Sequence, residues 1–411
     1  MSARYHEFRG HQWLSQPMKL QTGSLRLVAD DYLRTGDPVA YARVGKKATV
    51  YKVIRDGRHM ALKVFKKRYA LSENILTSIQ LNSLKTRPGL SVCSRRWIDV
   101  AEAEDIGEPG LAWAILMPWI DGEPWTALIE SRRVLTQDHC LALARYTAMV
   151  LAALESDEYV HADISSSNVF VQNLDGWPRI ELIDVEDMYH PAFVEVRSPP
   201  DGTAGYAHPK NVGLGCRNPY GDRFAGGVLL TEMVVWQHPE LRAAAMSDSL
   251  FAPRELCRPG AKFDAVAAAL DGQAPQLGAL FRRLWWSSGL DTCPTLQEWK
   301  SALADVNPEL TPLRRALWTS RLETEAAQRV RQDQQQTSLL EQSYCSECGQ
   351  WIPDFEPSAH ETTCSRHPAS QKQETGAPLL LPPDPNQKFL PVWPTFPGWR
   401  GPPDASHPGA W

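Results

Sequence analysis

The hydrophobic pattern of the chain changes near Gly122. Upstream, two β-prone runs at 48–54 and 60–65 flank an Asp56-Gly57 pair, which is a common hairpin turn sequence. Downstream, apolar residues recur on helical spacing. The clearest helix face carries Leu143, Tyr146, Val150, Leu151 and Leu154. This change of period predicts an α+β fold in which a β-rich part precedes a mainly helical part.

The composition excludes several classes of protein. The 411 residues include 43 Lys+Arg and 48 Asp+Glu, so the formal net charge is −5 and the overall basic footprint of a nucleic-acid binder is missing. The longest apolar run, residues 111–120, is about half of the ~20 residues that a membrane span needs. The first residues lack the apolar core of a signal peptide. We expect a soluble, cytoplasmic protein with no nucleic-acid or membrane partner.

Three residues with oxygen-bearing side chains follow the predicted helix. Asp163 and Asn168 lie on one loop, and Asp184 ends the returning strand of a hairpin. Such a hairpin can place three oxygen groups around one point, which suits Mg²⁺ and phosphoryl transfer. Upstream, Lys63 interrupts an apolar strand, where its charge is poorly solvated unless it is used, for example on a phosphate.

Six segments, in order, resemble the eukaryotic-like protein kinases in their bacterial Ser/Thr branch. The segments are 43–50 for the Gly-rich loop, 61–63 for the lysine strand, 161–168 for the catalytic loop, 184–186 for Asp-Phe-Gly, 202–210 for the end of the activation segment and 222–226 for the helix that anchors the catalytic loop. The resemblance covers roughly residues 25–305. It implies a bilobal protein kinase-like fold with a β-rich N-lobe and a helical C-lobe.

The resemblance also assigns roles to single residues. Asp163 would be catalytic and orient the acceptor hydroxyl, while Asn168 and Asp184 would hold Mg²⁺ or Mn²⁺ on ATP. The implied ATP-binding residues are Gly45 in the loop over the phosphates, Lys63 on the α- and β-phosphates, Glu73 as the ion-pair partner of Lys63, and Ile120 at the hinge beside adenine. By spacing, Ser78 and Gln80 are alternatives to Glu73.

Three of the departures from the family pattern affect expected contacts. Family members pair a Glu at the end of the activation segment with an Arg near the end of the domain, but here these positions are Lys210 and Cys293. Replacing both partners can be tolerated, whereas losing one leaves a buried unpaired charge. We therefore expect another contact to hold the C-lobe there. Ser165 replaces the usual Lys two residues after the catalytic Asp, which weakens the expected stabilisation of the γ-phosphate.

Three cysteines and a histidine cluster late in the chain. Cys345 and Cys348 lie at i and i+3, and His360 and Cys364 at i and i+4. Four such N and S ligands fit a closed tetrahedral Zn²⁺ site, and the spacing resembles small two-Cys, His-Cys zinc fingers. A segment of roughly 25 residues has too small a core to fold alone, so the metal would supply its stability.

These signals divide the chain into expected segments. They are an N-terminal extension at 1–24, a kinase N-lobe at 25–122, a kinase C-lobe at 123–306, a helical spacer at 307–343, a zinc finger at 344–368 and a disordered Pro/Trp-rich tail at 369–411.

The leading hypothesis is a Ser/Thr protein kinase of bacterial signalling that transfers the γ-phosphate of ATP to protein substrates. One alternative is a small-molecule phosphotransferase of the aminoglycoside-kinase type, because 161–168 and 183–187 also resemble its motifs. Another is a pseudokinase scaffold that binds nucleotide or a partner without catalysis. The partner of the zinc finger and the Pro/Trp-rich tail is unknown; an extended Pro-rich segment can bind an aromatic-lined groove.

Overall fold

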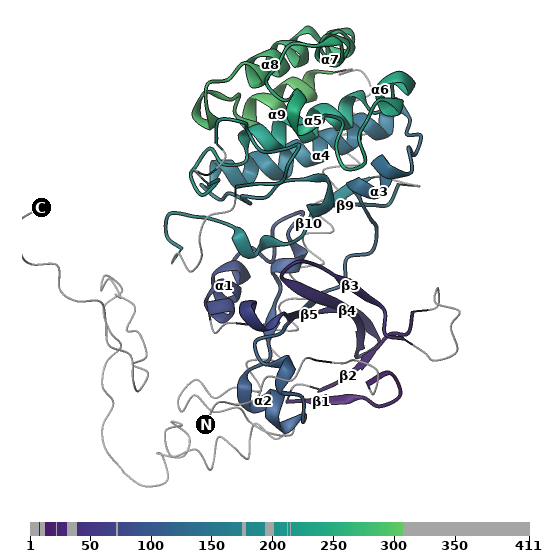
Figure 1. Ribbon diagram of the computed structural model, residues 1–411, viewed down its shortest axis with the longest axis vertical. Coiled ribbons are helices and arrows are strands. Elements are labelled where there is room, and N and C mark those ends of the chain that lie inside the picture. Colours follow the sequence, from purple (N-terminus) through teal and green to yellow (C-terminus); the bar gives the residue numbers. More distant parts are fainter. Residues whose placement is uncertain are drawn as a thin grey trace, which may run out of the picture. The chain divides into compact units, whose positions relative to one another are not determined.

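The computed structural model describes residues 8, 13–21, 23–30, 39–70, 73–174, 178–193, 201–211, 213 and 215–306. The expected helical spacer, zinc finger and Pro/Trp-rich tail lie outside the described residues. All described residues fall within one unit of the chain, Met1–Gln336. Within it, a β-sheet with α1 and α2 forms one part and a group of helices forms the other (Figure 1).

The β-rich part is one antiparallel sheet in the order β1-β2-β4-β5-β7-β6, with β3 also paired to β4. The predicted hairpin is confirmed, because Arg55 and Arg58 pair across a turn in which Asp56 and Gly57 both have positive φ. The sheet takes in residues upstream of the expected boundary at residue 25, since β1 pairs with β2. Its strands are β1 Met18–Leu20, β2 Gly23–Leu27, β3 Ala42–Val44, β4 Ala48–Arg55, β5 Arg58–Phe65, β6 Arg96–Trp97 and β7 Ile115–Pro118.

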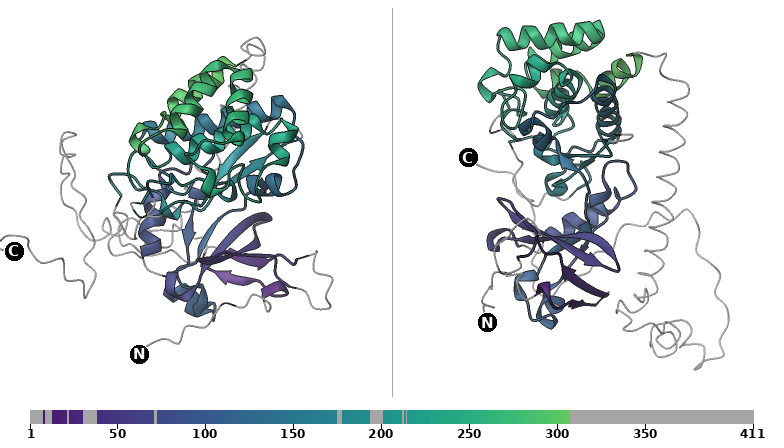
Figure 2. Two further views of the ribbon diagram at one scale, coloured as in Figure 1. Left: turned by 45° about the horizontal axis from the view of Figure 1, so that its top comes forward. Right: turned by 90° about the vertical axis from the view of Figure 1, so that its right-hand side faces the viewer.

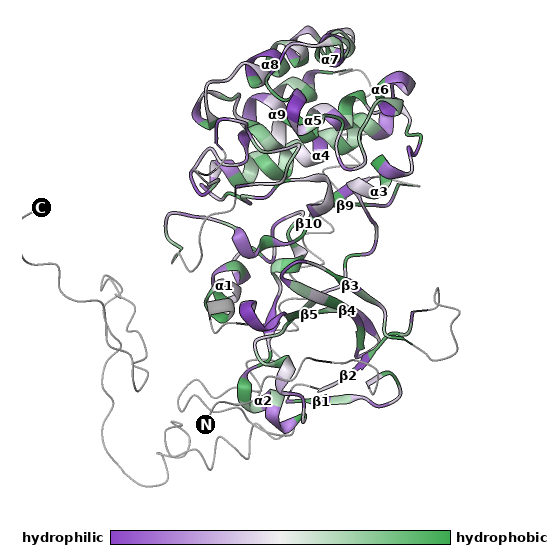
Figure 3. Cartoon of the chain, viewed as in Figure 1, coloured by the Kyte–Doolittle hydropathy of each residue, from purple (hydrophilic) through white to green (hydrophobic). Residues whose placement is uncertain are grey.

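The helical part surrounds α4, Gln137–Ser156, which contains the predicted helix face. α4 packs against α5 and α9, and the hydroxyl of Thr136 caps its first turn by accepting a hydrogen bond from the His139 amide. Hydrophobic residues run through the sheet and through α4 and α5 (Figure 3). The other α-helices described are α1 Glu73–Asn82, α2 Val100–Asp105, α3 Trp125–Glu130, α5 Arg223–Val235, α6 Pro239–Ala243, α7 Ala261–Gln273, α8 Pro275–Trp285 and α9 Leu296–Asp305.

A small second sheet connects the two parts. It runs β10-β9-β8, with β8 at Glu123–Pro124, β9 at Val169–Gln172 and β10 at Arg179–Leu182. Gly122 enters this sheet with φ +135°, and a Cβ there would lie 2.3 Å from the carbonyl oxygen of Val171, so only glycine fits. β9 directly follows the predicted catalytic loop, and β10 directly precedes the predicted metal-binding turn at Asp184.

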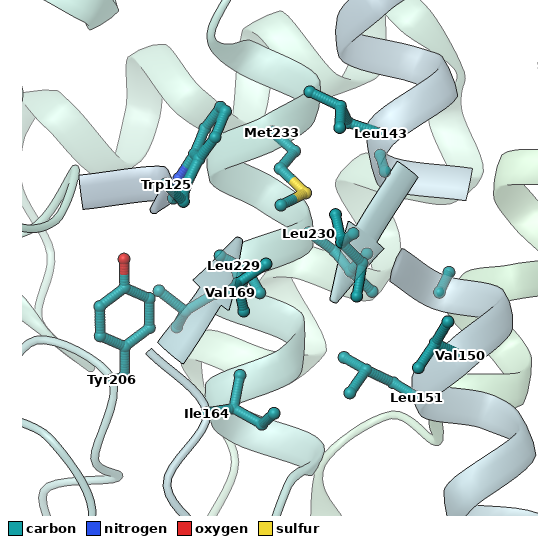
Figure 4. Close-up of a cluster of buried hydrophobic side chains, with 14 of the residues drawn as sticks. Trp125, Leu143, Val150, Leu151, Ile164, Val169, Tyr206, Leu229, Leu230 and Met233 are labelled. Carbon is teal, nitrogen blue, oxygen red and sulfur yellow. The ribbon is translucent and has the colours of Figure 1, made fainter. Parts of the chain in front are cut away.

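The larger hydrophobic core lies under this small sheet. Figure 4 shows Val169 of β9 with Leu229, Leu230 and Met233 of α5, and with Leu143 of α4. A smaller core lies within the β-rich part. In the views of Figure 2, too, the sheet and the helices remain distinct parts of the described chain. No helix among the described residues is long and apolar enough to cross a membrane.

Candidate active site

The predicted catalytic loop is held by one buried carboxylate. Asp222, immediately before α5, accepts hydrogen bonds from the backbone N–H groups of His161 and Ala162, at 2.6 and 2.9 Å. Ala162 has φ 67°, which costs about 1–2 kcal/mol for a residue with a Cβ, so the two bonds offset strain at this point. Asp222 thus anchors the loop rather than capping α5 with its side chain. Burial raises the pKa of Asp222, while His161 and the backbone donors oppose that rise.

The loop brings Asp163 and Asn168 together. The side-chain amide of Asn168 donates to the backbone oxygen of Asp163 at 2.8 Å and to its carboxylate Oδ2 at 3.0 Å. The hydroxyl of Thr203 donates to the other carboxylate oxygen at 2.7 Å. Asp163 therefore has a fixed orientation, and the contact with Thr203 shows that a side-chain hydroxyl fits against its carboxylate.

Lys63 meets two carboxylates from the turn after β10. The side chain of Lys63, 8% exposed, forms ion pairs with Asp184 and, at 2.7 Å, with Glu186. Asp184 itself is in the left-handed backbone region at φ 60°, and its side chain is 45% exposed. The structure therefore brings the predicted phosphate-binding and metal-binding residues into contact across 121 positions of sequence.

Opposing effects act on these charges. Burial disfavours the charged form of Lys63, but the carboxylates of Asp184 and Glu186 outweigh it and hold the pKa of Lys63 above its ordinary value. Burial likewise disfavours the ionised form of Glu186, but Arg95 and then Lys63 outweigh it and keep the pKa of Glu186 well below its ordinary value. Both shifts favour the charged form, so Lys63 and Glu186 form an ion pair at neutral pH.

The other predicted ATP-binding residues lie around this centre. Gly45 is exposed in the loop between β3 and β4, where its N–H donates to the Ala48 carbonyl at 2.8 Å. Ile120 lies between β7 and β8, is half-buried and packs against the larger core. Glu73 is the first residue of α1, and its side chain lies outside the described part of the chain.

A third acidic residue of the same turn ties down the predicted Gly-rich loop. The carboxylate of Asp187 accepts a 2.6 Å hydrogen bond from Lys47, which follows Gly45 in that loop, and lies 3.7 Å from Arg217. The turn after β10 thus contacts the β-rich part through Lys47 and Lys63 at once.

Comparison with known proteins finds serine/threonine-protein kinases that are similar to part of this chain. Serine/threonine-protein kinase PknL of Mycobacterium tuberculosis is 27% identical over 238 residues, which are 57% of this chain and 56% of that protein. PknL of Mycobacterium bovis shows the same identity and coverage. The likeness supports a protein kinase domain. The chain spans about half the length of the curated relatives it matches, and no protein-family model matches it.

A buried polar contact lies near the two positions that lack the family's Glu–Arg pair. A hydrogen-bonded group of His208, Ser287 and Cys293 joins the segment that ends two residues before Lys210 to the residues after α8. The Ser287 hydroxyl lies 3.2 Å from His208 Nε2 and 3.3 Å from the Cys293 thiol. The second family position, Cys293, thus contributes a neutral contact. Burial also lowers the pKa of His208, which favours its neutral form.

Sequence reasoning assigned no role at this site to Arg95, Glu186 or Asp187, and it placed Thr203 only within the end of the activation segment. Glu186 and Asp187 were visible as acidic residues after Asp184, but the family pattern places glycine at the first of them. Arg95 had no sequence signal, because a cationic side chain in a loop is ordinarily exposed.

The structure describes the residues predicted to hold Mg²⁺ but not the residues predicted to hold Zn²⁺. Among the described residues, no group of three or more His, Cys, Asp or Glu side chains could hold a metal ion. Mg²⁺ commonly uses one or two protein oxygens together with phosphates, and the Asp184 carboxylate and the Asn168 amide oxygen are donors of that type. The four predicted zinc ligands, Cys345, Cys348, His360 and Cys364, lie outside the described residues.

Proposed function

We propose that this chain is a Ser/Thr protein kinase that transfers the γ-phosphate of ATP to hydroxyl groups of protein substrates. The observation that carries the proposal is the ion pair between Lys63 of the sheet and Asp184 of the turn after β10. It joins a cation suited to phosphate with a carboxylate suited to Mg²⁺, next to the loop that holds Asp163 and Asn168. The distant likeness to PknL supports the same class of reaction.

In this proposal, each polar residue has one task. Asp163 accepts a hydrogen bond from the substrate hydroxyl, as it does from Thr203, and takes its proton as the oxygen attacks the γ-phosphorus and the bond to ADP breaks. Lys63 binds the α- and β-phosphates. Asn168 and Asp184 would hold Mg²⁺ or Mn²⁺, which neutralises phosphate charge when bound. Gly45 lies in the loop over the phosphates, and Ile120 lies beside adenine.

The decisive experiment is transfer of radiolabelled phosphate from Mg-ATP to the chain itself and to a generic protein acceptor. Asp163→Asn keeps the size of the side chain but removes the base, so the rate is expected to fall roughly 10²–10⁴-fold. ATP binding without transfer to any protein would instead favour the pseudokinase scaffold. Transfer to an aminoglycoside but not to protein would favour the small-molecule phosphotransferase.

We also propose that Cys345, Cys348, His360 and Cys364 hold one Zn²⁺ in a small interaction module. The donor set supports this, because three thiolates and one imidazole provide the four ligands of a tetrahedral zinc site. The catalytic candidates all precede this module, so its role would be to associate with a protein substrate or partner, together with the Pro/Trp-rich tail.

A further inference from the structure

The carboxylate that pairs with Lys63 comes from the turn after β10. Oε2 of Glu186 accepts a 2.7 Å hydrogen bond from the Lys63 ammonium, and Oε1 accepts a 2.7 Å bond from the guanidinium of Arg95. The side chain of Glu186 is 5% exposed. Each of its two oxygens therefore has a different cationic partner, which fixes the orientation of the carboxylate.

Arg95 is itself immobilised. Its side chain is fully buried, and its Nε donates to the carbonyl of Val92 at 2.8 Å. A buried guanidinium is costly unless it is paired, and among the described residues Glu186 is its carboxylate partner. Arg95, Glu186 and Lys63 thus form a buried chain of alternating charge that ends at Asp184.

The side chains of α1 that the structure describes, at residues 75–82, include no carboxylate. Ser78 there is 1% exposed, and its hydroxyl has no hydrogen-bond partner among the described residues. α1 packs directly against η6, Val185–Asp187, which contains Glu186. A serine is small enough to leave room for the Glu186 side chain between the helix and Lys63.

We propose that Glu186 is the positioning residue for Lys63 and that Arg95 fixes Glu186 from behind, so that the turn after β10 supplies an ion pair to the phosphate-binding lysine. This inference rests on the proposed function, because it assigns the group that holds the phosphate-binding lysine. The recognised ligand is the diphosphate portion of a nucleoside triphosphate.

The test compares wild type with Glu186→Gln and a matched control, Glu102→Gln. Glu102 is also buried and accepts two hydrogen bonds from an arginine, Arg96, at 2.6 and 2.7 Å, but it lies away from Lys63 on α2. The control therefore reproduces the loss of a buried Arg–Glu pair in the same β-rich part without touching the proposed site.

Two readouts are independent of phosphate transfer. The first is acetylation of Lys63 by a small amine-reactive ester, followed by mass spectrometry at a fixed mildly alkaline pH. Glu186→Gln removes one of the two carboxylates that hold and shield the buried ammonium, so Lys63 becomes more accessible to the reagent and the rate is expected to rise about 3–10-fold. The charged groups that contact Lys63 are Asp184 and Glu186, and Arg95 contacts Glu186.

The second readout is calorimetric binding of Mg-ATP. The dissociation constant is expected to rise about tenfold in Glu186→Gln, to recover partly in Glu186→Asp, and to stay within twofold of wild type in Glu102→Gln. Where the protein also transfers phosphate, kcat/KM for ATP should fall roughly 10²-fold, as a misplaced group causes.

Unchanged acetylation of Lys63 and unchanged Mg-ATP affinity in a folded Glu186→Gln protein would overturn the inference. Equal loss of affinity in Glu102→Gln would also overturn it, because the effect would then be one of stability. Failure of the proposed function gives a different result: wild type would transfer no phosphate to protein, while the acetylation and binding differences would persist.

Discussion

At the scale of single residues, Asp163 is held from two sides. The Asn168 amide and the Thr203 hydroxyl each donate to one of its carboxylate oxygens. Asn168 belongs to the same loop, whereas Thr203 comes from the segment before α5. The orientation of the proposed base therefore depends on a residue that is 40 positions away.

Replacing Thr203 by Val should slow phosphate transfer by about tenfold. The substitution keeps the shape of the side chain but removes a hydrogen bond to a charged group, which is worth about 1.5–3 kcal/mol. The measurement is kcat with saturating ATP and acceptor protein. Thr203→Ser retains the hydroxyl and should remain within a few-fold of wild type. Equal rates for Val and wild type would show that Thr203 does not orient Asp163.

At the scale of elements, two buried carboxylates, one just before α5 and one within it, connect this helix to other segments. Asp222 precedes the helix and holds the catalytic loop, while Glu232 lies within the helix and is fully buried. Glu232 accepts hydrogen bonds from four donors: Trp125 Nε1, the Tyr206 hydroxyl, the Ser249 hydroxyl and the Leu250 amide. Trp125 and Tyr206 come from distant segments, so this one side chain links α3, the activation segment and α5.

Stability should depend on pH through Glu232. Burial raises the pKa of Glu232 to about 7, although the four donors oppose the rise. The folded protein then binds a proton more tightly than the unfolded chain does. The contribution of Glu232 to the free energy of unfolding is therefore full below its ordinary pKa of 4.5 and is lost as pH rises to about 7.

The size of this effect is on the order of 3 kcal/mol. Urea unfolding of wild type and Glu232→Gln at pH 5, 6 and 7 measures it. The variant is less stable at every pH, because its NH₂ group faces donors, but its deficit should shrink as pH rises. A deficit that is constant across this range would mean that Glu232 keeps an ordinary pKa in the folded protein.

At the scale of the whole molecule, the β-rich part and the helical part are joined by charge as well as by chain. Lys47 and Lys63 of the β-rich part pair with Asp187 and Glu186 of the turn after β10. The proposed Gly-rich loop and the proposed phosphate-binding lysine thus both contact one short segment, which favours a fixed arrangement of the proposed ATP-binding residues.

The proposed zinc module should be separable from the kinase region. Full-length protein should contain about one Zn²⁺, and Cys345→Ser combined with Cys348→Ser should remove it, because two of the four ligands are lost. Metal content by mass spectrometry checks this, beside the thermal midpoint and ATP binding of the same samples. A chain ending after residue 319 is the control: it should lose zinc but keep both other properties. Zinc that remains in the double variant would refute the ligand set.

Much of the fold follows from the sequence, because local signals determine it. The Asp56-Gly57 turn, the face of α4 and the strands around the predicted catalytic loop are each encoded within a few residues. The sequence indicated only that Lys63 and Asp184 would both act near the phosphates of ATP, not that they would form an ion pair with each other. Glu186 and Arg95 were not found, because their partnership exists only after β10 and the loop before β6 meet in space. A buried Arg–Glu pair has no periodicity that a single sequence reveals.

The place of Glu186 also matters for inhibitor design. Asp184 and Glu186 lie on the same turn with one residue between them, so a compound that displaces this turn would remove the proposed metal-binding carboxylate and the proposed positioning residue of Lys63 together. A compound that moves α1 alone would not carry either group away. Selective inhibitors of this chain should therefore be sought among molecules that insert beside residues 184–187.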